Sequence, residues 1–232
     1  REVAERALKK IDLREQRERL NVWTALLNLE KAHGDEASFT AVFQRAQQGA
    51  DPKAVHLHVA SVHERAGDLE LTDAAYEAAC KKFKQSPDVW TAWMVSAVMR
   101  GEHARGKEIL QRAVNVLPLS QHVALISKFG QLEFKNGSAE RGRTVFDGIV
   151  ANYPKRVDIW SVYMDMELRM GEDEAIKRLF ERAISLRLSS KKMKFFFQRY
   201  LKYAHGVGDE ALVEHVKQRA REWVERATKD EE

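Results

Sequence analysis

Apolar residues recur along the chain with a period of about 34 residues. A glycine marks the phase of each unit; the six are Gly34, Gly67, Gly101, Gly137, Gly171 and Gly208. A first apolar column stands eleven positions before the glycines and contains Trp23, His56, Trp90, Ile126, Trp160 and Phe197. A second column follows three positions later and contains Leu26, Val59, Trp93, Phe129, Tyr163 and Tyr200. Because a spacing of three places both columns on one helical face, each unit is predicted to begin with an amphipathic helix.

The second half of each unit carries two further columns, one of large residues and one of small residues. The large residues, nine positions after each glycine, are Phe43, Tyr76, Leu110, Phe146, Phe180 and, as an exception, Lys217. The small residues, three positions later, are Ala46, Ala79, Ala113, Ala183 and Ala220, with Ile149 in the fourth unit. This alternation allows two helices to approach closely. A second helix is therefore predicted in each unit.

Polar, glycine and proline residues predict where these helices begin and end. The glycines are expected to close the first helices in the left-handed conformation. The expected N-caps are Asn21, Asp88 and Asp158 for first helices, and Asp35, Asp68, Ser138 and Asp209 for second helices. The residues expected to end second helices are Pro52, Pro87, Pro118 and Pro154.

Six helical hairpins in series predict an all-α fold, an α-solenoid of TPR-like hairpins, because one hairpin cannot bury its apolar faces alone. Residues 1–19 are interpreted as the end of a preceding repeat with a connecting helix, and 20–228 as the superhelical array. The first segment has an apolar stripe, formed by Val3, Ala4, Ala7, Leu8 and Ile11. Residues 229–232 are expected to be a frayed tail.

The repeat resembles the half-a-TPR, or HAT, repeat of eukaryotic RNA-processing assemblies. The fifth unit carries the resemblance most fully, in Trp160, Tyr163, Glu167, Phe180, Glu181, Arg182 and Ala183. Glu30, Glu133 and Glu167 share one register position on the apolar face of the first helix, which indicates a buried hydrogen bond to a neighbouring helix. His56, His63, Ala97 and Ala204 depart from the pattern. The resemblance implies an RNA-processing scaffold.

Three longer stretches narrow the resemblance. They are "ERALKKIDLREQRERLNVW", "YPKRVDIWSVYMDMELRMG" and "SSKKMKFFFQRYLKYAHGVGDE". Together they resemble the C-terminal HAT domain of ribosomal RNA biogenesis proteins with upstream S1 domains, the programmed cell death protein eleven family. The resemblance implies a nucleolar domain of the small-subunit processome, acting with pre-ribosomal proteins toward 18S rRNA, with the S1 domains binding pre-rRNA. A HAT scaffold of a splicing or 3′-end processing complex, and a direct RNA-binding module, remain as alternatives.

The sequence holds no pattern that favours catalysis, a cofactor or a metal site. In "HLHVASVH", His56 and His58 point to different helix faces, and His56 and His63 lie about 10 Å apart along one face, too far for one ion. His56 and the single cysteine, Cys80, are interpreted as core residues. No apolar run reaches the roughly 18 residues that a membrane span needs. The protein is therefore expected to be neither an enzyme nor a membrane protein.

Charge distinguishes one group of turns from the others. The net charge of +4 is small beside 39 basic and 35 acidic residues, and it does not decide the partner. Basic residues gather in the turns between units, where the candidate contacts with RNA or an acidic protein are Lys155, Arg156, Lys191, Lys192 and Lys194. Aromatic residues are assigned to packing between repeats instead; this set is Trp23, Trp90, Trp93, Trp160, Tyr163, Phe180, Phe197 and Tyr200.

Overall fold

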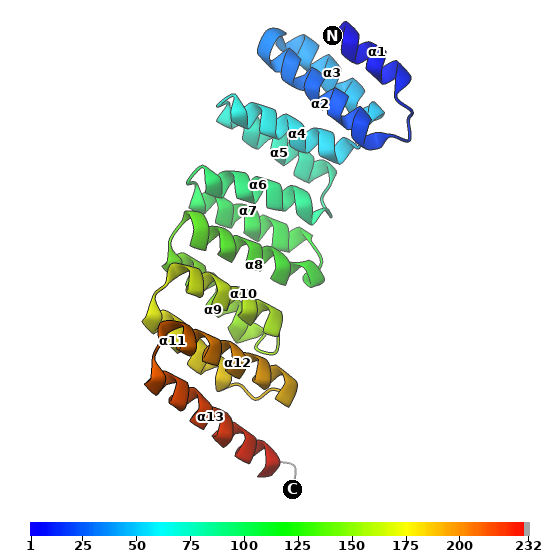
Figure 1. Ribbon diagram of the computed structural model, residues 1–232. Helices are drawn as coiled ribbons and strands as arrows, with labels where there is room; N and C mark the ends of the chain where they lie inside the picture. The colour runs from blue at the N-terminus through cyan, green and yellow to red at the C-terminus, as the bar shows by residue number, and fades with distance from the viewer. Residues whose placement is uncertain (230–232) are drawn as a thin grey trace. The chain divides into compact units, whose positions relative to one another are not determined.

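The computed structural model describes residues 1–229, and in that range the chain forms α-helices and no strand (Figure 1). The all-α class predicted from the period is confirmed. The helices are α1 (Glu2–Lys10), α2 (Gln16–His33), α3 (Glu36–Gly49), α4 (Pro52–Arg65), α5 (Leu69–Lys82), α6 (Pro87–Met99), α7 (His103–Val116), α8 (Leu119–Asn136), α9 (Ala139–Asn152), α10 (Val157–Met170), α11 (Asp173–Ile184), α12 (Ser190–Val207) and α13 (Glu210–Lys229).

The chain divides into two compact units, Arg1–Leu132 and Glu133–Glu232, with the division inside α8. In the first unit, α2 packs on α3, α4 on α5 and α6 on α7, and the first helices α2, α4 and α6 also contact one another in order. In the second unit, each helix from α9 to α13 contacts the next one along the chain. Each unit is thus built from consecutive helical hairpins.

Rings from successive helices stack at each junction where both packing columns are aromatic. In each pair, one ring belongs to the large-residue column of a second helix. The other ring belongs to the first helix of the next hairpin, in the column that contains Trp93, Tyr163 and Tyr200. The pairs are Tyr76–Trp93, Phe146–Tyr163 and Phe180–Tyr200, with ring centres 6.5, 5.0 and 4.7 Å apart. All eight rings assigned to packing expose no more than 7% of their surface. The aromatic rings of the columns therefore lie in the core. Among the other column members, Ile126, Phe43 and Leu110 are only half-buried, and Lys217 is exposed.

The second helices begin at the predicted caps. Asp35 accepts a hydrogen bond from the backbone N–H of Ser38, whose hydroxyl in turn accepts from the N–H of Asp35, so that α3 has a capping box. Ser138 caps α9, and Asp209 caps α13. Asp68 stands at the N-cap of α5, but its carboxylate binds Lys31 of α2 and not the helix N-terminus.

The expected caps of the first helices are wrong. Asp88 and Asp158 lie within the first turns of α6 and α10, where a carboxylate still interacts favourably with the helix dipole. Asn21 lies well inside α2, which begins at Gln16. The extra turn is held by buried Arg19, whose guanidinium donates to the backbone carbonyls of Leu8, Ile11 and Gly49.

The prolines do not end the second helices. Those helices end at Gly49, Lys82, Val116 and Asn152, before each proline is reached. Pro52 and Pro87 are instead the first residues of α4 and α6. Proline is favoured there because its fixed φ suits a helix and its missing N–H would have had no partner in the first turn.

The phase glycines are of two kinds. Gly67, Gly101, Gly171 and Gly208 have φ between +71° and +82°, as predicted. Gly34 and Gly137 do not; the backbone at Gly34 is extended, with φ −99° and ψ −167°. A Cβ at Gly34 would overlap the Glu30 carboxylate, and one at Gly137 would overlap the Glu133 carboxylate. A Cβ would also lie 2.8 Å from the Glu30 carbonyl oxygen at Gly34 and 2.9 Å from the Glu133 carbonyl oxygen at Gly137, so glycine is favoured at both positions by the backbone as well as by the carboxylate.

We expect Gly137→Ala to lower the free energy of unfolding by about 1–3 kcal/mol, because the added methyl overpacks the Glu133 carboxylate and its Arg141 partner. Gly148→Ala is the matched control in α9. Its Cβ would meet nothing within 4 Å, so we expect a gain of roughly 0.4–1 kcal/mol. Urea denaturation of both variants checks this; equal effects would contradict the role assigned to Gly137.

The two ends of the chain differ in part from expectation. Val3 of the predicted apolar stripe is 71% exposed, because α1 has only one packed face, from which Ala4 and Leu8 contact the core. Lys229 is the last residue of α13. The remaining residues of the predicted tail, 230–232, lie outside the described part of the chain.

Candidate partner-binding edge

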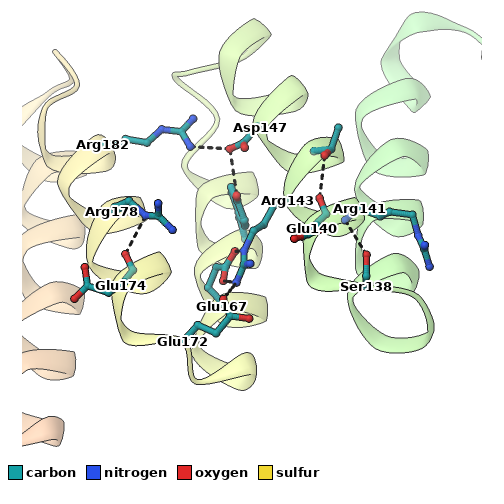
Figure 2. A network of polar contacts seen from close by, with 12 residues as sticks. Ser138, Glu140, Arg141, Arg143, Asp147, Glu167, Glu172, Glu174, Arg178 and Arg182 are labelled. Carbon is teal, nitrogen blue, oxygen red and sulfur yellow. Dashed lines mark hydrogen bonds and ion pairs between the residues drawn. The ribbon is translucent and has the colours of Figure 1, made fainter.

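Buried glutamates join neighbouring helices at the register position where the sequence predicted them. The Glu167 carboxylate, 1% exposed, accepts two hydrogen bonds at 2.7 and 2.8 Å from Arg143 of α9 (Figure 2). Glu30 is bound by Arg1 in the same two-pronged way, and Glu133 by Arg141. The expected hydrogen bond to a neighbouring helix is confirmed for Glu133 and Glu167, whose donors lie on α9, whereas the donor to Glu30 is Arg1, the residue before α1.

Hydrogen bonds in two of these pairs shift a pKa toward the charged form. The hydrogen bonds from Arg1, and then from Ser38, lower the pKa of Glu30. The Glu167 carboxylate, followed by that of Glu172, raises the pKa of Arg143 above its ordinary value. The glutamate column is therefore a set of structural ion pairs whose charges already have partners.

A second periodic feature, which sequence reasoning missed, is an arginine directly before the small column residue of the second helix. We call it the arginine ladder. Each arginine pairs with a carboxylate on the second helix of the preceding 34-residue repeat. The pairs are Arg45–Glu5, Arg112–Glu77, Arg182–Asp147 and Arg219–Glu181, at 2.8, 3.3, 2.7 and 3.1 Å. The signal was the recurrence of Arg-Ala at one register position.

Three ladder arginines also cover tryptophans of the first column. Arg182 lies 5.8 Å from the ring of Trp160, within the range of a cation–π contact. The indole N–H of Trp160 donates to the carbonyl of Pro154 at 3.0 Å. Arg112 and Trp90 repeat the arrangement, with a bond from Trp90 to the carbonyl of Lys84. The core thus fixes the turns between hairpins.

Residues with reactive side chains are buried among apolar groups. Burial raises the pKa of the Cys80 thiol to about 12, which leaves little thiolate at neutral pH. His56 lies between the rings of Phe43 and Phe83, and its Nε2 is 3.0 Å from Gln47 Oε1. Burial, followed by the charge of Lys82, lowers the pKa of His56. Both residues serve as core residues.

Metal ligands and membrane-crossing helices are absent from the described residues. Within 1–229, no three histidine, cysteine or acidic side chains come together as a metal site would require. Among the described helices, none combines the length and the hydropathy for crossing a membrane.

The basic residues of two consecutive turns between hairpins form one surface in the second compact unit. Lys155 and Arg156 occupy the turn between α9 and α10, and Lys191, Lys192 and Lys194 lie in the first turns of α12. All five are exposed. The Lys192 ammonium donates to the Lys155 carbonyl at 3.2 Å, so the two clusters lie side by side. We call these five residues the basic edge.

Only part of the basic edge has a charge partner. Arg156 forms a two-pronged ion pair with Asp158, at 2.7 and 2.9 Å, which raises the pKa of Arg156. The four lysines form no ion pair within residues 1–229. Their uncompensated charge makes this edge suited to an anionic partner.

Comparison with known proteins finds one family and several relatives that are similar to this chain. The family described as Suppressor of forked protein (Suf) matches residues 126–232. The rRNA biogenesis protein RRP5 of Arabidopsis thaliana is 48% identical over 225 residues, which cover 96% of this chain and 12% of that protein. The RRP5 homolog of Homo sapiens is 44% identical, over 97% of this chain and 12% of its own length. The chain belongs to the RRP5 family.

The RRP5 relatives match across both compact units, although the chain spans only about an eighth of their length. The relative from Schizosaccharomyces pombe, with 42% identity over 97% of the chain, fits the same description. Outside RRP5, the pre-mRNA-splicing factor SYF1 of Homo sapiens is 26% identical over 60% of the chain and 17% of its own length. The resemblance to the HAT domain of ribosomal RNA biogenesis proteins is confirmed.

Two solved structures are similar to this chain at lower sequence identity. A tetratricopeptide repeat protein from Parabacteroides merdae has a TM-score of 0.42 at 13% identity, covering 94% of this chain and 90% of its own. A structure of pilF from Pseudomonas aeruginosa has a TM-score of 0.41 at 10% identity, covering 90% of this chain and 93% of its own.

Proposed function

We propose that this chain is a non-catalytic HAT scaffold in ribosome biogenesis, part of a nucleolar small-subunit processome factor needed for pre-rRNA processing toward 18S rRNA. The observation that carries the proposal is the 42–48% identity to RRP5 proteins over nearly the whole chain. The burial of Cys80 and His56 supports a structural role for the residues that would otherwise suit catalysis. Protein partners are then pre-ribosomal proteins, and S1 domains elsewhere in the protein bind pre-rRNA more strongly.

A groove in the first unit supports the scaffold role. It has a volume of about 570 Å³ and runs over α2, α3, α4 and α5, with Phe39, Phe43 and Leu71 among its lining residues. Three acidic residues, Glu30, Asp35 and Glu36, also line it, with one basic residue, Lys31. Apolar side chains of a basic partner helix would fit this groove, because amphipathic helices dock their apolar face into such sites.

Crosslinking in purified pre-ribosomes tests the scaffold proposal. We expect the wild-type chain to crosslink to pre-ribosomal proteins, and Leu71→Glu to abolish the crosslinks that involve the groove. Leu119→Glu is the matched control, since Leu119 is 80% exposed outside the groove and Leu71 is 50% exposed within it. A wild-type chain that does not sediment with pre-ribosomes would contradict the proposal.

Direct, sequence-independent RNA binding is the second candidate function, and the four unpaired lysines of the basic edge favour it. A HAT scaffold of a splicing or 3′-end processing complex has weaker support, from the SYF1 match alone.

We expect the triple variant Lys191→Glu, Lys192→Glu and Lys194→Glu to bind single-stranded pre-rRNA fragments more weakly at low salt. The logarithmic salt slope should become shallower by about 0.7 for each phosphate that the variant no longer binds. A control with the same charge change replaces three exposed lysines outside the basic edge, Lys107 of α7, Lys128 of α8 and Lys202 near the other end of α12, by glutamate. Filter binding across a salt series measures both, with circular dichroism to check folding. Equal weakening in the two variants would show an effect of net charge and remove RNA from this edge.

A further inference from the structure

A pocket of about 380 Å³ lies in the second unit, beside the basic edge. The turn between α11 and α12 forms one wall, with Leu186, Arg187 and Ser189, and helix α13 forms the other. Ser190, which also lines the pocket, directly precedes Lys191 of the basic edge. The pocket is thus continuous with the surface proposed to contact RNA.

The charge in the pocket is positive, since three arginines and no acidic residue line it. Arg219 already has a partner, Glu181, at 3.1 Å. Arg226 donates only to the backbone carbonyl of Glu222, and Arg187 has no hydrogen bond or ion pair within the described residues. Two exposed guanidinium groups therefore remain for an anion, and their planar geometry suits phosphate.

An aromatic ring lines the same pocket. The chain has five tryptophans, of which Trp23, Trp90, Trp93 and Trp160 are buried in the packing columns. Trp223 is the exception, because it is half-buried and stacks on no other ring in the described part of the chain. Its indole is available for a ligand.

We propose that this pocket seats one nucleotide of a single-stranded RNA, with its base against Trp223 and its phosphate on Arg187 and Arg226. The proposal rests on the RNA contact of the basic edge. An RNA strand bound along that edge would place one of its nucleotides in this pocket. A flat aromatic surface beside cations is the combination that proteins use to bind single strands, since every base has a face to stack. An acidic peptide would use the arginines but would leave the indole without a partner.

Tryptophan fluorescence of the protein tests the pocket, with a ten-residue oligouridylate as the probe. Because the other tryptophans are buried, quenching on titration reports Trp223. We expect quenching of the wild type and about tenfold weaker binding for Trp223→Ala. Trp223→Phe keeps a stacking ring, so it should bind nearly as well as wild type while the quenching disappears. This second variant separates loss of stacking from loss of folding.

The arginines are tested with a closely matched control. The double variant Arg187→Ala and Arg226→Ala should make the logarithmic salt slope shallower by roughly 0.7 to 1.4, for one or two phosphate contacts. Arg178→Ala should change nothing, although Arg178 is also exposed and its Nε bonds the backbone carbonyl four residues earlier at 3.2 Å, as in Arg226.

Three outcomes would overturn the proposal, and they are distinguishable. If the wild type binds no oligouridylate, the RNA contact of the basic edge fails as well. If the lysine variant no longer binds RNA and the Trp223 and arginine variants still do, the edge stands and the pocket is wrong. If a polyglutamate peptide quenches Trp223 and RNA does not displace it, the pocket serves an acidic protein.

Discussion

Replacing Trp160 by alanine is expected to lower the free energy of unfolding by about 3–5 kcal/mol. The ring is 2% exposed, packs 6.2 Å from the ring of Phe196 and lies under Arg182. Its removal leaves a large cavity between hairpins and takes away the hydrogen bond to Pro154. Urea denaturation followed by circular dichroism measures the change.

Two further variants separate the causes of that destabilisation. Trp160→Phe keeps most of the volume but lacks the N–H, so we expect a smaller effect than for alanine. Tyr153→Ala, next to the same turn but 45% exposed, should cost less than about 1 kcal/mol. A Trp160→Ala variant as stable as Tyr153→Ala would mean that the first column does not hold the second unit together.

Replacing Arg143 by methionine is expected to cost about 3 kcal/mol, because it leaves Glu167 buried without its cationic partner. We take the lower end of the range for buried pairs, since the Arg143 side chain is 21% exposed. A double variant, Arg143→Met with Glu167→Leu, should recover most of the stability, because apolar side chains can replace a buried ion pair.

An exposed ion pair in the same unit provides the control for Arg143. Arg156 and Asp158 are both more than half exposed, so Arg156→Met should cost less than about 1 kcal/mol. Chemical denaturation of the four proteins completes the test. A double variant less stable than Arg143→Met would contradict the view that burial of an unpaired charge causes the destabilisation.

The sequence predicts the hairpins because each column repeats in the same register and falls on one helical face. It predicts that Glu30, Glu133 and Glu167 are buried for the same reason. Their partners could not be predicted, since Arg1 lies 29 residues before its glutamate, Arg141 follows by 8 and Arg143 precedes by 24. Arginines at such different separations reach equivalent carboxylates only through the tertiary arrangement.

The two kinds of phase glycine illustrate a second limit. Gly34 and Gly67 occupy the same register, yet only Gly67 has a positive φ, and a Cβ would meet the Glu30 carboxylate at Gly34 but nothing within 4 Å at Gly67. The pocket beside the basic edge shows a third limit. Trp223 stands at a position where other second helices have Gly49, Lys82 or Val116, so no column marks it. Periodicity predicts the residues that recur in every hairpin. It cannot predict a residue, such as Trp223, whose role is confined to one hairpin.

The arginine ladder has a consequence for how hairpins can be ordered in such a protein. Helix α11 contributes Arg182 to the carboxylate of α9 and Glu181 to the arginine of α13, so it has a distinct acceptor side and donor side. Helix α5 offers only Glu77, since Ala78 stands where the arginine would be. A duplicated α10–α11 hairpin could therefore join a copy of itself with every pair formed. A duplicated α4–α5 hairpin would leave Glu77 with only Lys81 of its own helix as a partner, so the ladder favours some orders of repeats over others, by the small free energy of exposed ion pairs.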